Sequence, residues 1–498
     1  VVELMGVPGV GPKTAKLLFE QAGVRGVAEL GVLAAAGGLR GLPGIQAKTE
    51  ANILKAIGAT RKRQARMPIG LALPLAEAMR RALARLREVD QMSLAGSIRR
   101  RRETVGDIDI LVTSSRPAAV MDAFTSLPEV GEVMSRGSTK SSVRHREGIQ
   151  VDLRVVEPEA FGAALVYFTG SKQHNIRIRE MAVRRGLKIS EYGVFSDGDG
   201  ARVAGRTEEE VYASIGMPWI PPEIREDAGE IEAAIAGKLP HLVELGDIRG
   251  DLHDHTDASD GQQSVEALVE AVRARGYQYV AVSDHSRSSP DGRGLSAEAL
   301  RSHVARIRSV QERHPQIRIL AGSECDILPD GAMDYPDPLL SELDIVVGAV
   351  HSQPGQSKSE MTRRICAALA NPYLRILAHP SGRLLGERDP SEVDMEEVLQ
   401  TALRHGKAVE INCAPRRLDL SDVHARRAAD LGVLVAISTD ARAPEDLERV
   451  ELGVATARRG WVEADQVVNA WPVARLLGWL GEPRGGEASR GGPRGRRR

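Results

Sequence analysis

Residues 279–285 read YVAVSDH, a short apolar run that ends in polar residues, and similar runs recur along the C-terminal half of the chain. They are IRILAGSE (317–324), DIVVGAVHS (344–352), LRILAHP (374–380), AVEINC (408–413) and VLVAIST (433–439). Stretches with a helical apolar period separate them, and repeated strand–helix units predict a parallel sheet or barrel. The carboxyl ends of barrel strands converge on one pocket, so we expect the polar residues after these runs to lie together.

These strand ends carry histidines and carboxylates in strand order. The eight candidates are His253, His255, Asp260, His285, Glu324, His351, His379 and Asp440. Two of them, in DLHDH (251–255), are two residues apart, so a strand would present both imidazoles on one face. A mixture of imidazoles and carboxylates suits Mn²⁺, Zn²⁺ or Fe²⁺ better than Mg²⁺ alone. One histidine at a strand end is usually structural, but eight such residues predict a metal centre.

A second group of carboxylates is predicted in AGSIRRRRETVGDIDILV (95–112) and VDLRVV (151–156). Asp107 and Asp109 are two apart in a strand pattern and therefore project from one face, and Asp152 lies in another strand pattern. Crowded carboxylates repel unless a cation lies among them, and such oxygen ligands suit Mg²⁺. Two metals there would drive an in-line displacement at phosphorus. Alone, a pair of aspartates in a strand is a common surface feature.

The first 64 residues contain an internal repeat. GVPGVGPKTAKLLFE (6–20) and GLPGIQAKTEANIL (41–54) each place a Pro-Gly turn and a Lys-Thr pair at the start of a helical pattern. Glycine amides at a helix N-terminus bind phosphate without reading bases. The repeat resembles helix-hairpin-helix motifs, and ordinary glycine-capped turns are the alternative. Contacts to the DNA backbone are expected from Gly9, Gly11, Lys13, Thr14, Gly44 and Lys48.

The composition of the 498 residues, with 42% apolar and 27% charged side chains, excludes disordered, collagen-like and membrane classes. No apolar run of about 18 residues and no signal peptide is present. Three scattered cysteines (Cys325, Cys366 and Cys413) form no CxxC pair. We therefore expect a cytoplasmic protein that is not attached to a membrane.

The formal net charge of -1 conceals two charged halves. Residues 1–222 carry 32 basic and 24 acidic side chains, a net charge of +8, whereas residues 223–480 carry 29 and 42, a net charge of -13. The first half suits a phosphate backbone, and the second suits divalent metals. The basic tail GEPRGGEASRGGPRGRRR (481–498) has low complexity and is expected to be disordered.

Four motifs together, GS-x-R-R, GDIDILV, VDLRVV and YFTGSKQHNIRIR (167–179), resemble the catalytic half of a family X DNA polymerase over residues 1–222. The resemblance implies that the three aspartates hold two metals, Mg²⁺ or Mn²⁺, and that Asp152 also helps to activate the primer 3′-OH. The residues that it implies in contact with the incoming nucleotide are Gly96, Ser97, Arg100, Gly106, Tyr167, Phe168, Gly170, Asn175 and Arg179. Asn175 and Arg179 are also expected to contact the template.

The spacing of the eight C-terminal candidates, with GRLLGERDP (382–390), NPYLRILAHP (371–380) and TARRGW (456–461), resembles the polymerase-and-histidinol-phosphatase (PHP) domain of bacterial family X polymerases. That resemblance implies up to three metals and 3′–5′ exonuclease or related phosphoesterase activity. Two positions depart from the family. Arg442 stands where the pattern has histidine, and INCAP (411–415) stands where it has IN-x-N-P. An arginine has no lone pair for a metal, so it should weaken one metal position and could clamp a phosphate.

The predicted fold is multidomain, α+β followed by α/β. Its parts are a helix-hairpin-helix segment (1–64), a nucleotidyltransferase-type palm (65–156), a nucleotide-binding subdomain (157–222), a linker (223–247), a distorted (β/α)7 PHP barrel (248–480) and the tail. An amphipathic helix is expected over residues 75–89. Relatives begin with a further lyase-like domain, for which we recognise no counterpart here.

The predicted function is DNA-directed synthesis across short gaps in DNA repair, including base excision repair, with trimming of 3′ ends by the barrel. The expected partners are primed or gapped DNA and dNTPs, bound by a monomer associated with the bacterial nucleoid. Two alternatives remain: a PHP phosphatase tethered to DNA, and a noncatalytic binder of DNA ends.

Overall fold

The computed structural model describes residues 12–24, 26–40, 42, 45, 46, 49, 50, 53, 66–289 and 292–481. The chain divides into two compact units, residues 1–67 and 68–498. In the first unit, α2 (Pro12–Gln21) and α3 (Val27–Ala35) pack Leu18 and Leu30 into a small buried core. The predicted tail beyond residue 481 lies outside the described residues.

The second unit begins with a sheet that carries the three predicted aspartates. Its strand order is β2–β4–β7–β6–β5, and only the β4–β7 pair is parallel. The strands are β2 (Gln91–Ala95), β4 (Asp107–Thr113), β5 (Val130–Arg136), β6 (Lys140–His145) and β7 (Gln150–Val156). Between them lie α6 (Gly96–Arg99), β3 (Thr104–Val105) and α7 (Pro117–Thr125). This is the small α+β part expected from the sequence.

The predicted helix over 75–89 starts earlier and ends earlier. It is α5 (Ile69–Leu83), preceded by β1 (Met67–Pro68) at the boundary of the two units. Its buried residues follow the helical period: Ile69, Ala72, Ala76, Met79 and Leu83. The buried face therefore ends at Leu83, and the polar residues after it form turns.

A second core joins helices with a three-stranded antiparallel sheet, β10–β9–β8. The elements are α8 (Phe161–Thr169), α9 (Lys172–Val183), β8 (Leu187–Ser190), β9 (Gly193–Ser196), β10 (Arg202–Ala204), α10 (Glu208–Ser214) and α11 (Glu230–Ile235). Residues 223–247 were expected to be a linker, but Ile224, Ile231 and Leu242 are buried in this core. Burial of these apolar side chains holds the segment here despite its acidic composition.

The C-terminal part is a seven-stranded parallel barrel with strand order β11 to β17. A parallel bridge between Asp254 and Ala441 joins its first and last strands. The strands are β11 (Gly250–Asp254), β12 (Tyr279–Val282), β13 (Arg318–Asp326), β14 (Ile345–Ala349), β15 (Leu374–Leu377), β16 (Ala408–Asn412) and β17 (Leu434–Ser438). The predicted (β/α)7 barrel is thereby confirmed.

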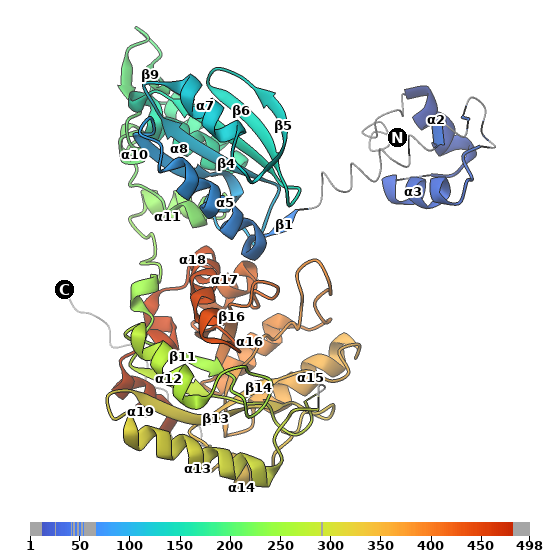
Figure 1. The fold of residues 1–498 in the computed structure, drawn as a ribbon, viewed down its shortest axis with the longest axis vertical. Coiled ribbons are helices and arrows are strands. Elements are labelled where there is room, and N and C mark those ends of the chain that lie inside the picture. Colours follow the sequence, from blue (N-terminus) through green and yellow to red (C-terminus); the bar gives the residue numbers. More distant parts are fainter. Residues whose placement is uncertain are drawn as a thin grey trace. The chain divides into compact units, whose positions relative to one another are not determined.

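Helices cover the outside of the barrel (Figure 1). They are α12 (Val265–Ala274), α13 (Ala297–Arg313), α14 (Asp337–Leu340), α15 (Lys358–Leu369), α16 (Met395–Arg404), α17 (Asp422–Leu431), α18 (Val450–Arg459) and α19 (Val473–Gly481). Because both faces of the strands are covered, nearly every strand residue is buried, as the continuous apolar runs require. Trp471 and Trp479 pack against Tyr279, the first residue of β12, so they cover the end opposite to the predicted site.

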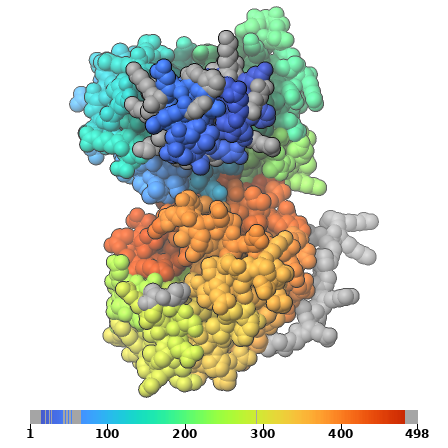
Figure 2. All heavy atoms as spheres, turned by 90° about the vertical axis from the view of Figure 1, so that its right-hand side faces the viewer, coloured from blue at the N-terminus to red at the C-terminus, as the bar shows by residue number. Residues whose placement is uncertain are grey.

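Within the second unit, the barrel touches the α+β part (Figure 2). Ile69 packs against Leu418 and Leu452 of the barrel, and Arg383 pairs with Glu103 at 2.8 Å. In the part of the chain that the structure describes, no helix has the length and apolar character needed to cross a membrane.

Candidate metal centres and nucleotide site

The parallel pairing of β4 with β7 brings the three predicted aspartates together. Asp109 is the register partner of Asp152, and Asp107 lies two residues before Asp109. Paired residues of neighbouring strands project from the same face. Burial, then the charges of Asp107 and Asp152, raise the pKa of Asp109 to about 7. The charges of Asp107 and Asp152 disfavour ionisation of Asp109, so this acidic face is a site that a cation would stabilise.

Two features hold this acidic face in place. Gly96 has φ of +66°, and a Cβ built there would lie 2.5 Å from Asp109 Oδ2, so the loop approaches the carboxylate because no side chain intervenes. On the other side, Lys140 Nζ lies 3.2 Å from Asp152 Oδ2, and Gln150 Nε2 donates to Asp152 Oδ1 at 2.8 Å. Sequence reasoning missed Lys140 and Gln150, although both lie on strands beside the predicted aspartate.

The predicted nucleotide residues come from α6, the end of α8 and the start of α9. Arg100 follows α6 directly, and its guanidinium donates to Thr169 O and, at 3.0 Å, to Glu226. Gly170 follows α8, and a Cβ built there would lie 3.1 Å from Arg100 Nη1. The predicted glycine and arginine are therefore neighbours, although 70 residues separate them.

The aromatic pair is held by polar contacts. Tyr167 and Phe168 meet edge to face at 5.0 Å between ring centroids, and the Arg154 guanidinium lies 4.4 Å from the Phe168 centroid. Asn175 Nδ2 donates to Tyr167 O at 2.7 Å, and within the described part of the chain its buried Oδ1 makes no hydrogen bond. Arg179 donates back to Asn175 O at 3.1 Å. The motif is thus one connected cluster rather than a set of separate surface residues.

A buried ion network braces this cluster. Glu208 accepts from Arg99 at 2.7 and 2.9 Å and from Arg225 at 2.7 and 3.1 Å, and it also accepts from Trp219 at 2.8 Å. Arg225 is completely buried. Burial opposes ionisation of Glu208, but the two guanidiniums outweigh it and hold its pKa well below the usual range. None of these contacts follows from sequence spacing alone.

In the barrel, the predicted histidines and acids meet at the carboxyl ends of the strands. Three groups have ligand atoms within 4.8 Å of one another: His253 with His255 and Asp440, His255 with His285 and Glu324, and Glu324 with His351 and His379. These residues come from β11, β12, β13, β14, β15 and β17 or directly after them. All eight predicted residues therefore meet here: seven belong to these groups, and Asp260 Oδ1 lies 3.2 Å from His255 Nδ1.

The chemistry of this centre fits divalent metals. His253 Nε2, His255 Nε2 and Glu324 Oε2 are buried and make no hydrogen bond within the described structure. Burial lowers the pKa of His285, but Glu324 and Asp260 outweigh it and raise that pKa to about 10. Buried lone-pair donors that make no hydrogen bond are costly unless a cation binds them. His379 and Asp440 have φ of +27° and +54°, strained backbone of the kind that clusters at functional sites.

Two carboxylates that the sequence reasoning missed orient the histidines. Glu410 Oε1 lies 2.7 Å from His253 Nδ1, and Glu410 Oε2 accepts from the His379 amide at 2.8 Å. Asp326 Oδ1 lies 2.5 Å from His351 Nδ1. Such contacts fix which ring nitrogen faces the metal. Two features of the sequence could have indicated these carboxylates. Glu410 is a charged residue inside the apolar run AVEIN, and Asp326 lies two residues after Glu324, on the same face of a strand.

Asp260 and Asp440 differ from the other predicted ligands of the barrel site because both pair with Arg442. Asp260 Oδ2 accepts from Arg442 Nε at 2.5 Å, and the same guanidinium donates to Asp440 Oδ1. Arg442 Nη2 also lies 3.4 Å from His285 Nε2. A fixed positive charge therefore lies among three predicted ligands, where the family pattern would place a neutral imidazole.

The predicted DNA contacts of the first unit are largely outside the description. Gly9, Gly11, Gly44 and Lys48 are not among the described residues, and the side chain of Lys13 is not described either. Thr14 lies half-buried in α2. These contacts stay predictions.

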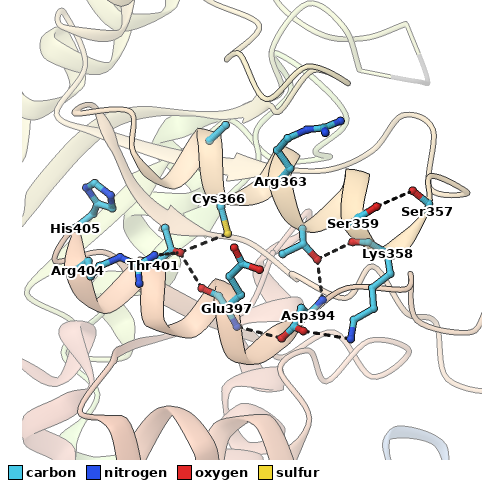
Figure 3. A pocket seen from close by; sticks show the side chains of 12 residues that line it. Ser357, Lys358, Ser359, Arg363, Cys366, Asp394, Glu397, Thr401, Arg404 and His405 are labelled. Atoms are coloured by element: carbon cyan, nitrogen blue, oxygen red, sulfur yellow. Dashed lines mark hydrogen bonds and ion pairs between the residues drawn. The ribbon is translucent and has the colours of Figure 1, made fainter.

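A groove of about 850 Å³ lies apart from both acidic sites, between α15 and α16 on the outside of the barrel (Figure 3). Lys358 pairs with Asp394 there at 3.2 Å, and Thr401 Oγ1 lies 3.4 Å from Cys366 Sγ. Its lining includes none of the predicted site residues.

Three family models match the chain in the order of its parts. "SAM-like Helix-hairpin-helix tandem" matches residues 1–59, "DNA polymerase beta thumb" matches 164–226 and "PHP domain" matches 251–413. Fold and sites together define a class: chains that join a polymerase-β-type module to a PHP barrel. The DNA polymerase/3′-5′ exonuclease PolX of Bacillus subtilis (strain 168) is 40% identical over 94% of this chain and 82% of its own length. The chain belongs to the PolX family.

Other relatives match parts of the chain. A "Probable phosphatase TTE1963" of Caldanaerobacter subterraneus subsp. tengcongensis is 30% identical over 213 residues, 40% of this chain and 79% of its own. Two crystal structures of Leishmania infantum polymerase beta, a ternary gap complex and a ternary P/T complex, cover 45% of this chain and 88% and 97% of their own. They are 24% and 25% identical, each with a TM-score of 0.34.

Proposed function

We propose that this chain is a DNA-directed DNA polymerase that fills short gaps in DNA repair, and that its PHP barrel removes nucleotides from 3′ ends. The observation that carries the polymerase is the acidic face of β4 and β7, where Asp109 and Asp152 are register partners and the Asp109 pKa is raised to about 7. The observation that carries the nuclease is the set of buried ligand atoms in the barrel. Membership of the PolX family supports both.

In polymerisation, the primer 3′ oxygen bonds to the α-phosphorus of a dNTP as the bond to pyrophosphate breaks. Asp107, Asp109 and Asp152 would hold divalent cations, Mg²⁺ or Mn²⁺, which would supply positive charge for this step. In this proposal Asp152 accepts the proton of the 3′-OH. Ser97 and Arg100 bind the triphosphate, as do the glycine amides at 96 and 106, and Tyr167, Phe168 and Gly170 form the floor beneath the sugar. Asn175 and Arg179 position the base and the template.

In the barrel, Mn²⁺, Zn²⁺ or Fe²⁺ would be held by the three groups of His and carboxylate ligands, with Glu410 and Asp326 orienting the imidazoles. When bound, these cations would supply Lewis-acid chemistry for the hydrolysis of a phosphodiester. Arg442 contributes a guanidinium that can bind the phosphate of a DNA strand. Residues 1–64 hold the DNA backbone, the chain acts as a monomer, and chromosomal DNA places it at the nucleoid.

One labelled gapped duplex tests both activities, assayed with Mg²⁺ and with Mn²⁺. We expect Asp107→Ala to abolish primer extension and leave 3′ degradation intact, because the two sites use separate ligands. We expect His253→Asn to do the reverse. Loss of both activities in either variant would contradict two independent sites.

A small phosphate monoester, assayed beside the gapped duplex, separates the alternatives. The barrel resembles proteins named probable phosphatases, so a phosphatase tethered to DNA is the second candidate. Phosphate release from a small monoester without dNTP incorporation would favour it. A noncatalytic binder of DNA ends would show neither activity at any metal concentration.

A further inference from the structure

Arg459, the last residue of α18, is a charged side chain buried where the barrel meets the α+β part. Only 4% of its side chain is exposed. It donates to Asp422 of the barrel at 2.9 and 2.6 Å. It also donates to the backbone oxygen of Arg100 at 2.7 Å and to Glu226 Oε1 at 3.0 Å. One guanidinium thus connects the barrel to the loop that carries a predicted triphosphate ligand.

The same carboxylate oxygen holds the side chain of Arg100. Glu226 Oε1 accepts from Arg100 Nε at 3.0 Å, and Arg102 lies 3.8 Å from it. Arg100 is itself mostly buried, with 13% of its side chain exposed. The negative charge of Glu226 is therefore shared between Arg459 and the arginine that would bind nucleotide.

The division of the Glu226 charge between Arg459 and Arg100 determines how strongly the Arg100 guanidinium can bind a triphosphate. A guanidinium committed to a carboxylate offers less charge to a triphosphate, and an uncompensated carboxylate repels it. Arg459 neutralises Glu226 from the barrel side and weakens its hold on Arg100. The Arg100 carbonyl, fixed by Arg459, also sets where this loop lies.

We propose that Arg459 is a positioning residue for nucleotide binding, through which the PHP barrel sets the affinity of the polymerase site for the incoming dNTP. The proposal rests on the proposed polymerase function and on Arg100 as a triphosphate ligand. The metal centre of the barrel takes no part in it, because the connecting residues lie on α17, α18 and the segment after residue 222.

Arg459→Met tests this in the full chain by steady-state extension of a gapped duplex. We expect KM for dNTP to rise roughly tenfold, which corresponds to the loss of about one charge-assisted hydrogen bond. The value of kcat at saturating dNTP and the Kd for gapped DNA should stay close to wild type. Adding Glu226→Gln should return KM towards wild type, since it removes the charge that holds Arg100. A purely structural role would not be rescued by removing a second hydrogen-bonding group.

Arg458→Met is the matched control. Arg458 precedes Arg459 on α18, and among the described residues it donates to Glu223 Oε1 at 2.8 Å and to Val243 O at 3.1 Å rather than to Arg100 or Glu226. We expect its KM for dNTP to stay unchanged. An unchanged KM in Arg459→Met, or a raised KM that Glu226→Gln does not reduce, would overturn the proposal. Absence of extension by the wild-type chain would instead overturn the polymerase function.

Discussion

At the residue scale, the most informative position is Arg442. Its guanidinium contacts Asp260 and Asp440 and lies beside His285, so it already supplies a cation to part of the predicted ligand set. Asp260 is absent from the three compact ligand groups found among the described residues. A carboxylate paired with a permanent cation has less to gain from a metal, so Arg442 weakens both Asp260 and Asp440 as ligands.

Arg442→His should therefore create a metal position. We expect the purified variant to hold more Mn²⁺ per chain by elemental analysis and to degrade 3′ ends faster, because imidazole offers a lone pair where the guanidinium offers none. Arg442→Met is the control, since it removes the charge without adding a ligand. Equal metal content in the wild type and the His variant would count against this interpretation.

At the element scale, parallel strand pairing brings the candidate metal ligands of both sites together. β4 and β7 place Asp109 beside Asp152, and the barrel strands deliver ligands from both ends of the sequence to one place. β16 contributes differently: its Glu410 holds His253 and the His379 amide rather than joining a ligand group. One buried carboxylate therefore orients two predicted ligands that are 126 residues apart.

Glu410→Gln should lower metal affinity in the barrel about 10- to 100-fold, the usual cost of losing an orienting partner of a ligand histidine. Competition with a chelator of known affinity measures this directly, and primer extension should be unaffected. Glu397→Gln, an exposed acid on α16, is the control. Metal affinity equal to wild type would show that Glu410 does not orient His253.

At the scale of the whole molecule, the second unit is held together by buried arginines as well as by apolar cores. Arg225 is fully buried against Glu208, and Arg459 joins the barrel to the α+β part. A buried ion pair adds little net stability over apolar packing, but removing one partner leaves the other charge uncompensated. The main role of these arginines is therefore to position the elements that carry the site residues, rather than to add net stability.

Glu208→Gln should destabilise the core of α8, α9 and α10 by about 3–5 kcal/mol, because it leaves Arg99 and Arg225 without their counterion. Hydrogen exchange resolved by peptide measures this loss of local unfolding free energy. The amides of the barrel strands should keep their protection from exchange. The neighbouring Glu209 is exposed, so Glu209→Gln should change stability by less than about 0.5 kcal/mol. Equal protection in both variants would argue against a structural role for the network.

The sequence by itself determined the barrel and most of the ligand set. Apolar runs that end in His or an acid can be recognised locally, since the strand period and the shared carboxyl edge follow from backbone geometry. The same local logic placed Asp107 and Asp109 on one face. It assigned residues 223–247 to a linker from the prolines before them and from their acid content, although four of their apolar residues enter a core.

Tertiary structure alone decided the partners of the buried charges. The contacts of Glu208 with Arg99, Glu410 with His253, and Arg459 with Glu226 join residues 109, 157 and 233 positions apart. No period or motif encodes such a pair, because its energy depends on burial and on the direction of each side chain, which exist only after the elements have packed. The sequence thus determined which chemistry is present, and the fold decided which charges hold it in position.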